Sequence, residues 1–259
     1  MVWSAKTVKG AIEAMFRDFK KRQGEVLEII VRHYVQTAEP VGSRFVSRQL
    51  GLSSATIRNV MTDLEEMGLI SQPHTSAGRI PTDKGYRFYI DSLMRVKSVN
   101  EQMARVVREH YNETMRSLED VLEKTSHLVS TLTNYIGIAL FTRYDKLYLD
   151  GASHIVEQPE FKDIRKLYML LKCLEEKSDI LNLLSNDFKD DRLAIHIGKE
   201  SGFNYLNDCS VVTRGYKIKG AFSGRVGVIG PKRMVYEKVI PMVELLADSV
   251  TDIFKKLEI

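Results

Sequence analysis

The chain has 259 residues, 44% of them hydrophobic and 28% charged, so it can bury the cores of two globular domains. Its formal net charge of +4 is uneven, because residues 1–97 contain 15 Lys and Arg against 10 Asp and Glu while the remainder is slightly acidic. No apolar run approaches the roughly 18–20 residues of a membrane span, no signal-peptide core is present, and the two cysteines lack zinc-site or disulfide-framework spacing.

These bounds set the expected class of protein. We expect a cytoplasmic protein with no stable membrane insertion, no cofactor and no metal site. The basic excess of the first third favours a polyanionic partner there, although a solvated basic surface has the same composition.

The first third of the chain contains a succession of helical patterns. Residues 1–20 are basic and amphipathic, which suits contact with a membrane surface, packing on the next element, or a partly disordered lead-in. Residues 24–43, GEVLEIIVRHYVQTAEPVGS, predict a helix with one buried stripe that stops at Pro40 and Gly42. A short helix is expected between Ser43, a good N-cap, and Gly51, a good C-terminal stop.

Residues 53–68, SSATIRNVMTDLEEMG, predict a third helix, with Ser53 or Ser54 as N-cap and Gly68 as terminator. At 100° per residue, the apolar residues gather on the side expected to pack inward: Ile57, Val60, Met61, Leu64 and Met67. The opposite side carries Ala55, Arg58, Asn59, Thr62 and Glu66. Residues 69–82, LISQPHTSAGRIPT, then read as a β-hairpin, and Thr82 caps a further helix. This order predicts a winged helix-turn-helix.

A winged helix-turn-helix places its third helix in the major groove of DNA. Arg58 has the donor fork that matches guanine, Asn59 can bond adenine twice, and Ala55 can touch a thymine methyl group. The candidates for base readout are Ser54, Ala55, Arg58, Asn59 and Thr62. The candidates for the DNA backbone and for wing contacts are Ser43, Arg44, Arg48, His74, Thr75, Ser76 and Arg79.

Two of the wing residues have specific expectations. Arg79, at the wing tip, is placed to enter the narrow minor groove, and His74 is a hydrogen-bonded turn residue and not a metal ligand. Two other interpretations of the whole surface stay open. A polar helix face can simply lie in solvent, and winged helices also serve as protein-binding modules.

Residues 99–132 form a long helical pattern, and the polar HYNET at 110–114 indicates a break into two helices. Its apolar stripe either packs in the core of its own domain or pairs between molecules. Strand-like residues 135–144 and LYLDGAS follow as a pair. Helical residues 159–187 come next, and then three further strand-like segments: 192–198, 209–218 and 220–230. The last helix is expected to start near Pro231, run to about Leu257 and bend at Pro241. This mixture predicts an α+β domain.

The C-terminal region suggests an anion-binding site and a cysteine nucleophile, and each suggestion has a simpler alternative. Gly224, Gly227 and Gly230 precede Lys232 and Arg233, which could meet an anion, but tight turns between strand and helix account for the glycines. Cys173 or Cys209 would be the nucleophile of an enzyme, but both lie in apolar patterns that favour buried, inert thiols. We therefore expect no catalytic residues.

Four long runs resemble the HrcA family of heat-inducible transcription repressors. They are SATIRNVMTDLEEMGLISQPHTSAGRIPTDKGYR (54–87), GASHIVEQPEF (151–161), IHIGKES (195–201) and GVIGPKRMVYEKVI (227–240). The resemblance covers residues from about 22 to 257. It implies a homodimeric repressor of heat-shock operons that binds double-stranded operator DNA at the inverted repeat called CIRCE. It also implies a GAF-like C-terminal domain and control of activity by the chaperonin.

One departure from the family pattern matters. Family members are usually longer, with an inserted dimerising segment in the GAF-like domain, whereas here YIGIALFTRY leads through Asp145 and Lys146 directly into LYLDGAS. If the insertion is absent at this point, dimerisation must use other surfaces.

The resulting expectation is an α+β protein in which a winged helix-turn-helix domain is joined by a long helical segment to the GAF-like domain. The expected divisions are an N-terminal extension (1–20), a DNA-binding domain (21–97), a helical linker or dimerisation segment (98–132) and a regulatory domain (133–259). An alternative function is a metabolite-sensing repressor that uses the GAF-like domain as its ligand pocket.

Overall fold

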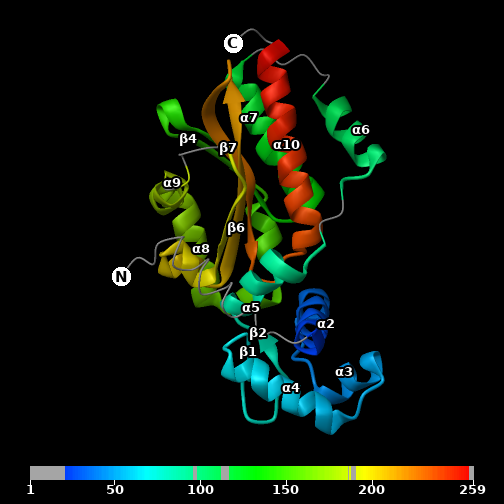
Figure 1. Cartoon of the computed structure of the whole chain (residues 1–259). Helices are drawn as coiled ribbons and strands as arrows, with labels where there is room; N and C mark the ends of the chain where they lie inside the picture. The colour runs from blue at the N-terminus through cyan, green and yellow to red at the C-terminus, as the bar shows by residue number, and fades with distance from the viewer. Residues whose placement is uncertain (1–20, 96–97, 112–116, 186, 188–190, 257–259) are drawn as a thin grey trace. The chain divides into compact units, whose positions relative to one another are not determined.

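The structure is a computed structural model that describes residues 21–95, 98–111, 117–185, 187 and 191–256 (Figure 1). The chain divides between Met94 and Arg95 into two compact units. The amphipathic pattern expected over residues 1–20 lies outside the described residues. None of the helices in the described part of the chain combines the length and the apolar content needed to cross a membrane.

The first unit is a helical domain with a small antiparallel hairpin. Its elements are α2 (Lys21–Thr37), α3 (Ser43–Leu50), α4 (Ser54–Glu66), β1 (Ile70–Ser71), β2 (Ile80–Pro81), α5 (Asp83–Phe88) and the π-helical turn η1 (Tyr89–Leu93). Ile70 pairs with Pro81 and Ser71 with Ile80. Thr82 caps α5 as expected, because its hydroxyl accepts a hydrogen bond from the amide of Gly85. Three helices followed by a hairpin form the predicted winged helix-turn-helix.

Two expected helix ends in this unit are wrong. The first helix stops at Thr37 and not at Pro40, because Ala38 takes a left-handed conformation with φ of 56° and turns the chain. Gly42, and not Ser43, is the N-cap of α3, and no side chain caps that end. Ser43 is therefore the first residue of the helix. Gly51 ends α3 in the left-handed conformation, as expected.

The second unit is built around one five-stranded antiparallel sheet. Its helices are α6 (Glu101–His110), α7 (Leu118–Thr133), α8 (Ile164–Glu176), α9 (Ser178–Ser185) and α10 (Tyr236–Lys256). Its strands are β3 (Ile136–Phe141), β4 (Lys146–Asp150), β5 (Ala194–Ile197), β6 (Cys209–Ile218) and β7 (Ala221–Pro231), in the spatial order β4-β3-β7-β6-β5. The last strand in sequence thus lies beside the first, at the centre of the sheet.

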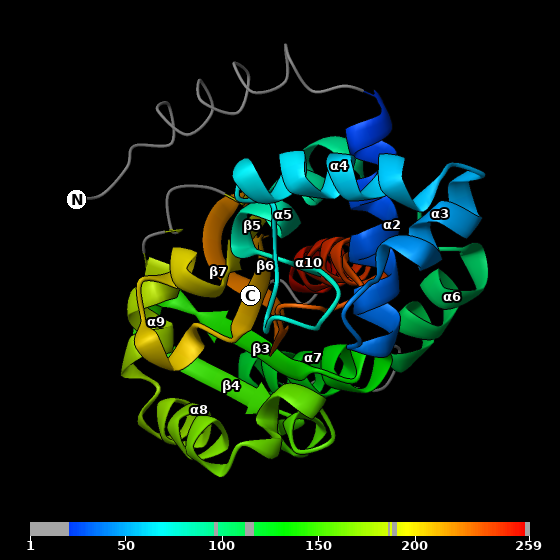
Figure 2. The ribbon, with the colours of Figure 1, turned by 90° about the horizontal axis from the view of Figure 1, so that it is seen from below.

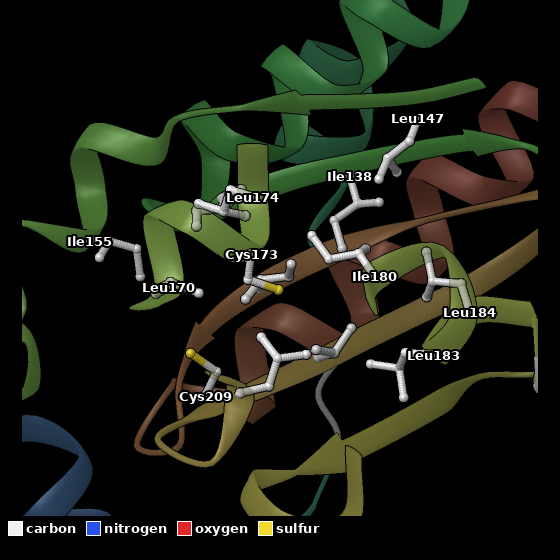
Figure 3. Packing of buried hydrophobic residues seen from close by; sticks show 14 of the residues in the cluster. Ile138, Leu147, Ile155, Leu170, Cys173, Leu174, Ile180, Leu183, Leu184 and Cys209 are labelled. Carbon is white, nitrogen blue, oxygen red and sulfur yellow. The ribbon is translucent and has the colours of Figure 1, made fainter. Parts of the chain in front are cut away.

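Helices cover both faces of this sheet, which makes the unit an α+β domain of three layers (Figures 1 and 2). Side chains of successive residues in β3 alternate between the faces. One face of β3 contributes Ile136, Ile138 and Leu140 to an apolar cluster. The same cluster contains Cys173 of α8 and Leu184 of α9 (Figure 3). The opposite face packs against α7 and α10.

Several glycines mark places where backbone packs directly on a strand. A Cβ atom at Gly137 of β3 would overlap the carbonyl oxygen of Ser126 in α7, and one at Gly227 of β7 would overlap the carbonyl oxygen of Val212 in β6. The expectation that Gly224, Gly227 and Gly230 form tight turns before a helix is therefore wrong. All three lie inside β7, where only hydrogen fits against the neighbouring atoms.

The remaining boundaries in this unit follow the predicted pattern in part. The helical pattern of 99–132 does break in two, giving α6 and α7. The pattern of 159–187 gives a 3-10 turn at Pro159–Lys162 and then α8 and α9, which separate at Lys177, where φ is 58°. Pro231 ends β7 and does not begin the last helix, which starts at Tyr236 and contains Pro241. The connection from β3 to β4 is only the short turn η2 (Thr142–Tyr144) and Asp145.

A buried arginine that the sequence patterns did not single out holds a connection to the sheet. Arg225 of β7 has no exposed surface, and its Nη1 donates to the carbonyl oxygen of Asp187 at 2.7 Å. Its Nη2 donates to the carbonyl oxygen of Arg192 at 2.6 Å, and its Nε to Oγ1 of Thr213 at 3.0 Å. A buried guanidinium needs such acceptors, because an unsatisfied buried charge is costly.

The contact between α7 and β3 yields a test of the packing. Gly137→Ala should lower the free energy of unfolding of the second unit by about 1–3 kcal/mol, because the methyl group forces backbone apart. Urea unfolding followed by circular dichroism measures this loss. Gly42→Ala is the matched control, since no atom lies within 4 Å of its Cβ position and its φ of −83° suits any residue. Equal stability of the two variants would contradict the packing.

Candidate nucleic-acid interface

The turn between α3 and α4 is fixed by hydrogen bonds at both helix ends. Ser47 Oγ donates to the carbonyl oxygen of Leu52 at 2.5 Å, which ties α3 to the turn. Ser53 is the N-cap of α4, because its Oγ accepts from the amide of Thr56 at 3.1 Å. The helix therefore begins at Ser54, and Gly68, with φ of 71°, follows its end. These bonds set the direction in which α4 leaves the turn.

The two sides of α4 have the predicted burial. Ile57, Val60, Met61 and Leu64 are buried, whereas Met67, also expected to face inward, is half-buried at the C-cap. Gln23 of α2 also donates to Oδ2 of Asp63 at 3.2 Å, so a polar contact joins α2 and α4 beside the apolar one. The side chains on the other side are exposed: Ala55, Arg58, Asn59, Thr62 and Glu66. Ser54 is half-buried.

The exposed side of α4 holds donors that the rest of the protein does not use. Within the described ranges, no side-chain hydrogen bond or ion pair engages Arg58 or Asn59. Thr62 differs, because its hydroxyl donates to the carbonyl oxygen of Arg58 at 3.0 Å. Its oxygen is then left as an acceptor, which suits an amino group of adenine or cytosine better than a carbonyl oxygen of a base.

The backbone candidates on α3 are partly accessible. Arg44 and Arg48 are exposed, whereas Ser43 is half-buried at the start of the helix. Between them, Phe45 packs with its ring centroid 4.1 Å from that of His33 in α2. This contact anchors the side of α3 that faces α2 and leaves the two arginines outside.

The tip of the wing is an ordered turn with three exposed candidates. Gln72 Nε2 donates to the carbonyl oxygens of Thr75 and Ala77, at 2.9 and 3.0 Å. His74 accepts at its carbonyl oxygen from the amide of Ala77, and its Nδ1 lies 3.4 Å from Ser76 Oγ. His74 is thus the hydrogen-bonded turn residue that the sequence predicted, and it is exposed together with Thr75 and Ser76.

Arg79 does not lie at the wing tip, so the expectation that it is placed to enter the minor groove from there is wrong. It precedes β2 at the base of the hairpin, where its amide and carbonyl both bond the backbone of Val41 at 2.9 Å. Its guanidinium bonds Oε2 of Glu65 in α4 through Nε at 3.0 Å and Nη2 at 2.9 Å. A half-buried residue with these partners holds the wing, the α2–α3 connection and α4 together.

Sequence reasoning did not identify the partners in this arrangement. Glu65 and Arg79 are fourteen positions apart and Val41 is further away, so no local periodicity relates them. The glycine at position 78 is the sequence feature that could have indicated this arrangement. In the structure, a Cβ atom there would meet the Val41 backbone. A glycine beside a wing arginine is therefore a sign of close backbone approach as much as of a turn.

The second unit offers no reactive thiol among its cysteines. Burial raises the pKa of the Cys173 thiol to about 11 and also raises that of Cys209, so both are protonated at neutral pH. Cys173 extends from α8 and Cys209 begins β6, and both lie in the apolar cluster (Figure 3). The expected buried thiols are confirmed.

The basic residues after β7 are engaged within the same unit. Arg233 forms an ion pair with Glu160 and also donates to Gln158 at 3.0 Å. Lys232 donates its amide to the carbonyl oxygen of Asp208 at 3.2 Å. Across the described residues, no group of three His, Cys, Asp or Glu is arranged to hold a metal ion.

Comparison with known proteins connects this geometry to one family. Residues 18–93 match the model of the winged helix-turn-helix transcription repressor HrcA, DNA-binding, and residues 97–240 match the HrcA protein C terminal domain. The heat-inducible transcription repressors HrcA of Geobacter sulfurreducens and Lachnoclostridium phytofermentans are each 31% identical to the chain. These alignments cover 90% and 91% of this chain, and 98% and 97% of the relatives.

Two further features of the comparisons concern length and fold. The alignments with these relatives run over 334 and 336 positions, so both contain residues without a counterpart among the 259 of this chain. A crystal structure described as a hypothetical protein, at 20% identity, has a TM-score of 0.73 and covers 93% of this chain and all of the other. It shares the fold. The two matched models together span most of the sequence, and the chain belongs to the HrcA family of heat-inducible transcription repressors.

Proposed function

We propose that the chain represses heat-shock operons by binding, as a homodimer, the inverted-repeat CIRCE operator, and that the chaperonin modulates its activity. The observation that supports this most is the row of exposed side chains on the first half of α4, Ala55, Arg58 and Asn59, opposite a fully packed apolar stripe. The operator, the dimer and the chaperonin follow from the family resemblance. The base-reading chemistry follows from the residues themselves.

Each residue of this row has a distinct role in the proposal. Arg58 donates two hydrogen bonds to O6 and N7 of guanine, Asn59 bonds N6 and N7 of adenine, and Ala55 contacts a thymine methyl group. Thr62, one turn further on, accepts from a base amino group or lies at the groove edge. Glu66 is repelled by phosphates, so α4 leaves the groove near this residue.

The remaining candidates position the domain on DNA without reading sequence. Arg44 and Arg48 bind phosphates beside the major groove, and Ser43 supports the same contact from the start of α3. The exposed wing tip, residues 74–76, lies along the adjacent backbone. We assign Arg79 to holding the wing against α4, in place of the minor-groove role that the sequence suggested.

The proposed division of the chain keeps an extension (1–20), a DNA-binding domain (21–97), a helical segment (98–132) and a GAF-like regulatory domain (133–259). The packing of α7 on β3 places residues 118–133 in the core of the second unit, which favours the core interpretation of the apolar stripe there. No observation favours the metabolite-sensing alternative. The glycines of β7 are packed against neighbouring atoms and Arg233 is paired.

Substitutions on α4 and α3 separate base readout from backbone binding. Arg58→Ala and Asn59→Ala should each weaken operator binding by about 1–3 kcal/mol and leave binding to scrambled DNA almost unchanged. Arg44→Ala should weaken both equally and reduce the salt slope by about one unit. Fluorescence anisotropy over a salt series measures these effects, with the exposed Arg105→Ala of α6 as control. If every variant lost as much affinity for scrambled DNA as for the operator, the assignment would be refuted.

The Arg79–Glu65 pair allows a second test, which distinguishes holding the wing from contacting DNA. Glu65→Ala and Arg79→Ala should weaken operator binding to a similar extent, because either change frees the wing, and should leave the salt slope unchanged. The exchanged pair, Glu65→Arg with Arg79→Glu, should recover most of the affinity. If Arg79 instead touches phosphate, Arg79→Ala alone would reduce the slope by about one unit, and Glu65→Ala would not weaken binding.

The chaperonin step has its own measurement. A loss of about 1–2 kcal/mol in stability changes an active fraction several-fold, so brief heating should inactivate part of the repressor. Added chaperonin should then increase the fraction that binds operator after cooling. An unfolded competitor protein should remove this gain. A recovery that is the same with and without chaperonin would contradict this part of the proposal.

A further inference from the structure

Helix α8 exposes an apolar stripe on the outside of the second unit. Its inner side is buried through Leu170, Cys173 and Leu174 (Figure 3). On its outer side Ile164 is 78% exposed and Tyr168 65% exposed. These two residues are four positions apart and therefore neighbours on one face. Scattered single apolar residues are normal at a surface, whereas contiguous apolar residues mark interaction sites as their area grows.

The same exposed side has a charge order that the helix itself does not favour. Arg165 and Lys166 lie in the first turn and Glu175 and Glu176 in the last, although the N-cap Asp163 places one carboxylate beside the start of the helix. The helix dipole prefers the opposite order, with acids at the N-terminus and bases at the C-terminus. Lys166 has a partner in Asp208, but Arg165 and Glu175 are exposed.

A second copy of α8 in antiparallel orientation satisfies this order. An antiparallel pair about a two-fold axis at the level of Leu170 places Arg165 of each copy opposite Glu175 of the other. It also places Tyr168 opposite Lys172, whose ammonium can lie over the ring in exchange for its exposed i,i+4 ion pair with Glu176 at 3.6 Å. The two charged positions are about 15 Å apart along the helix. One antiparallel arrangement therefore forms an Arg165–Glu175 ion pair at each end. A two-fold interface requires one patch that complements itself, which Arg165 with Glu175 and Tyr168 with Lys172 do.

We propose that the outer face of α8, defined by Ile164, Arg165, Tyr168, Lys172 and Glu175, binds the same face of a second copy of the chain. The inference rests on the proposed function in one respect, since a repressor of an inverted repeat acts as a two-fold dimer. One pair of 13-residue helices buries less than the roughly 1,600 Å² of a standard interface. The dimer is therefore weak and depends on protein concentration.

Sedimentation velocity of the full chain without DNA, over a wide concentration series, tests this interface. The wild type should dimerise reversibly. Tyr168→Glu should weaken dimerisation by at least about 30-fold, the effect of losing a central contact, and Ile164→Glu should also weaken it, because it places an acid opposite Glu176 at each end of the pair. The matched control is Val106→Glu, because Val106 of α6 is also an exposed apolar side chain, at 43%. It should dimerise like the wild type. Circular dichroism verifies that each variant is folded.

A charge exchange excludes a purely structural effect. Arg165→Glu should weaken dimerisation, because it places two acids opposite each other at both ends of the pair. Adding Glu175→Arg should restore dimerisation to within about threefold of the wild type, since each exchanged charge again faces its opposite. A structural defect in α8 would not be repaired by a second change ten residues away.

The outcomes separate this interface from the proposed function. A wild type that stays monomeric at every concentration, or α8 variants that dimerise normally, would overturn the interface. Loss of dimers in Val106→Glu alone would assign them to α6 and also overturn it. If the wild type is monomeric and the α8 variants lose chaperonin binding, the outer face of α8 binds the chaperonin and the interface between copies is overturned. If the α8 variants dissociate as expected but the wild type does not distinguish operator from scrambled DNA, the interface stands and the proposed function fails.

Discussion

The burial of one side of α4 is the constraint on which the DNA-binding unit depends. Because Ile57, Val60, Met61 and Leu64 pack inward, the helix cannot rotate, and the side chains between them must point outward. The Ser53 cap fixes where the helix begins, and the Gln23–Asp63 hydrogen bond adds a polar contact with α2. Arg58 and Asn59 are thereby presented on a rigid element, which is what bidentate recognition of a base requires.

The sequence was sufficient wherever the information is local. Helical spacing predicted the inner and outer sides of α4, and the cap residues Ser53, Gly51 and Thr82 lie where their chemistry places them. Arg79 shows the limit of this reasoning. Its guanidinium is held by Glu65 and its backbone by Val41, and these contacts exist only after folding. An arginine next to a glycine in a wing therefore looks like a DNA contact until its partners are known.

The second unit shows the same limit in a different form. The alternation of Ile136, Ile138 and Leu140 indicates a buried strand, but it does not show that Gly137 lies against the backbone of α7. The position of the β7 glycines between a strand pattern and a helix pattern suggests tight turns, whereas close packing within the strand is the cause. Arg225 could not be predicted, since its acceptors are mainly backbone carbonyls that no side-chain pattern reveals.

The central claim is that Arg58 reads a guanine, and base-atom substitution tests it most directly. Each guanine of one operator half-site is replaced in turn by 7-deazaguanine, which lacks the N7 acceptor, and affinity is measured for the wild type and for Arg58→Ala. The account predicts one position at which the replacement weakens the wild type about tenfold and leaves the variant unchanged. Equal losses in both proteins at every position, or no loss in the wild type, would contradict it.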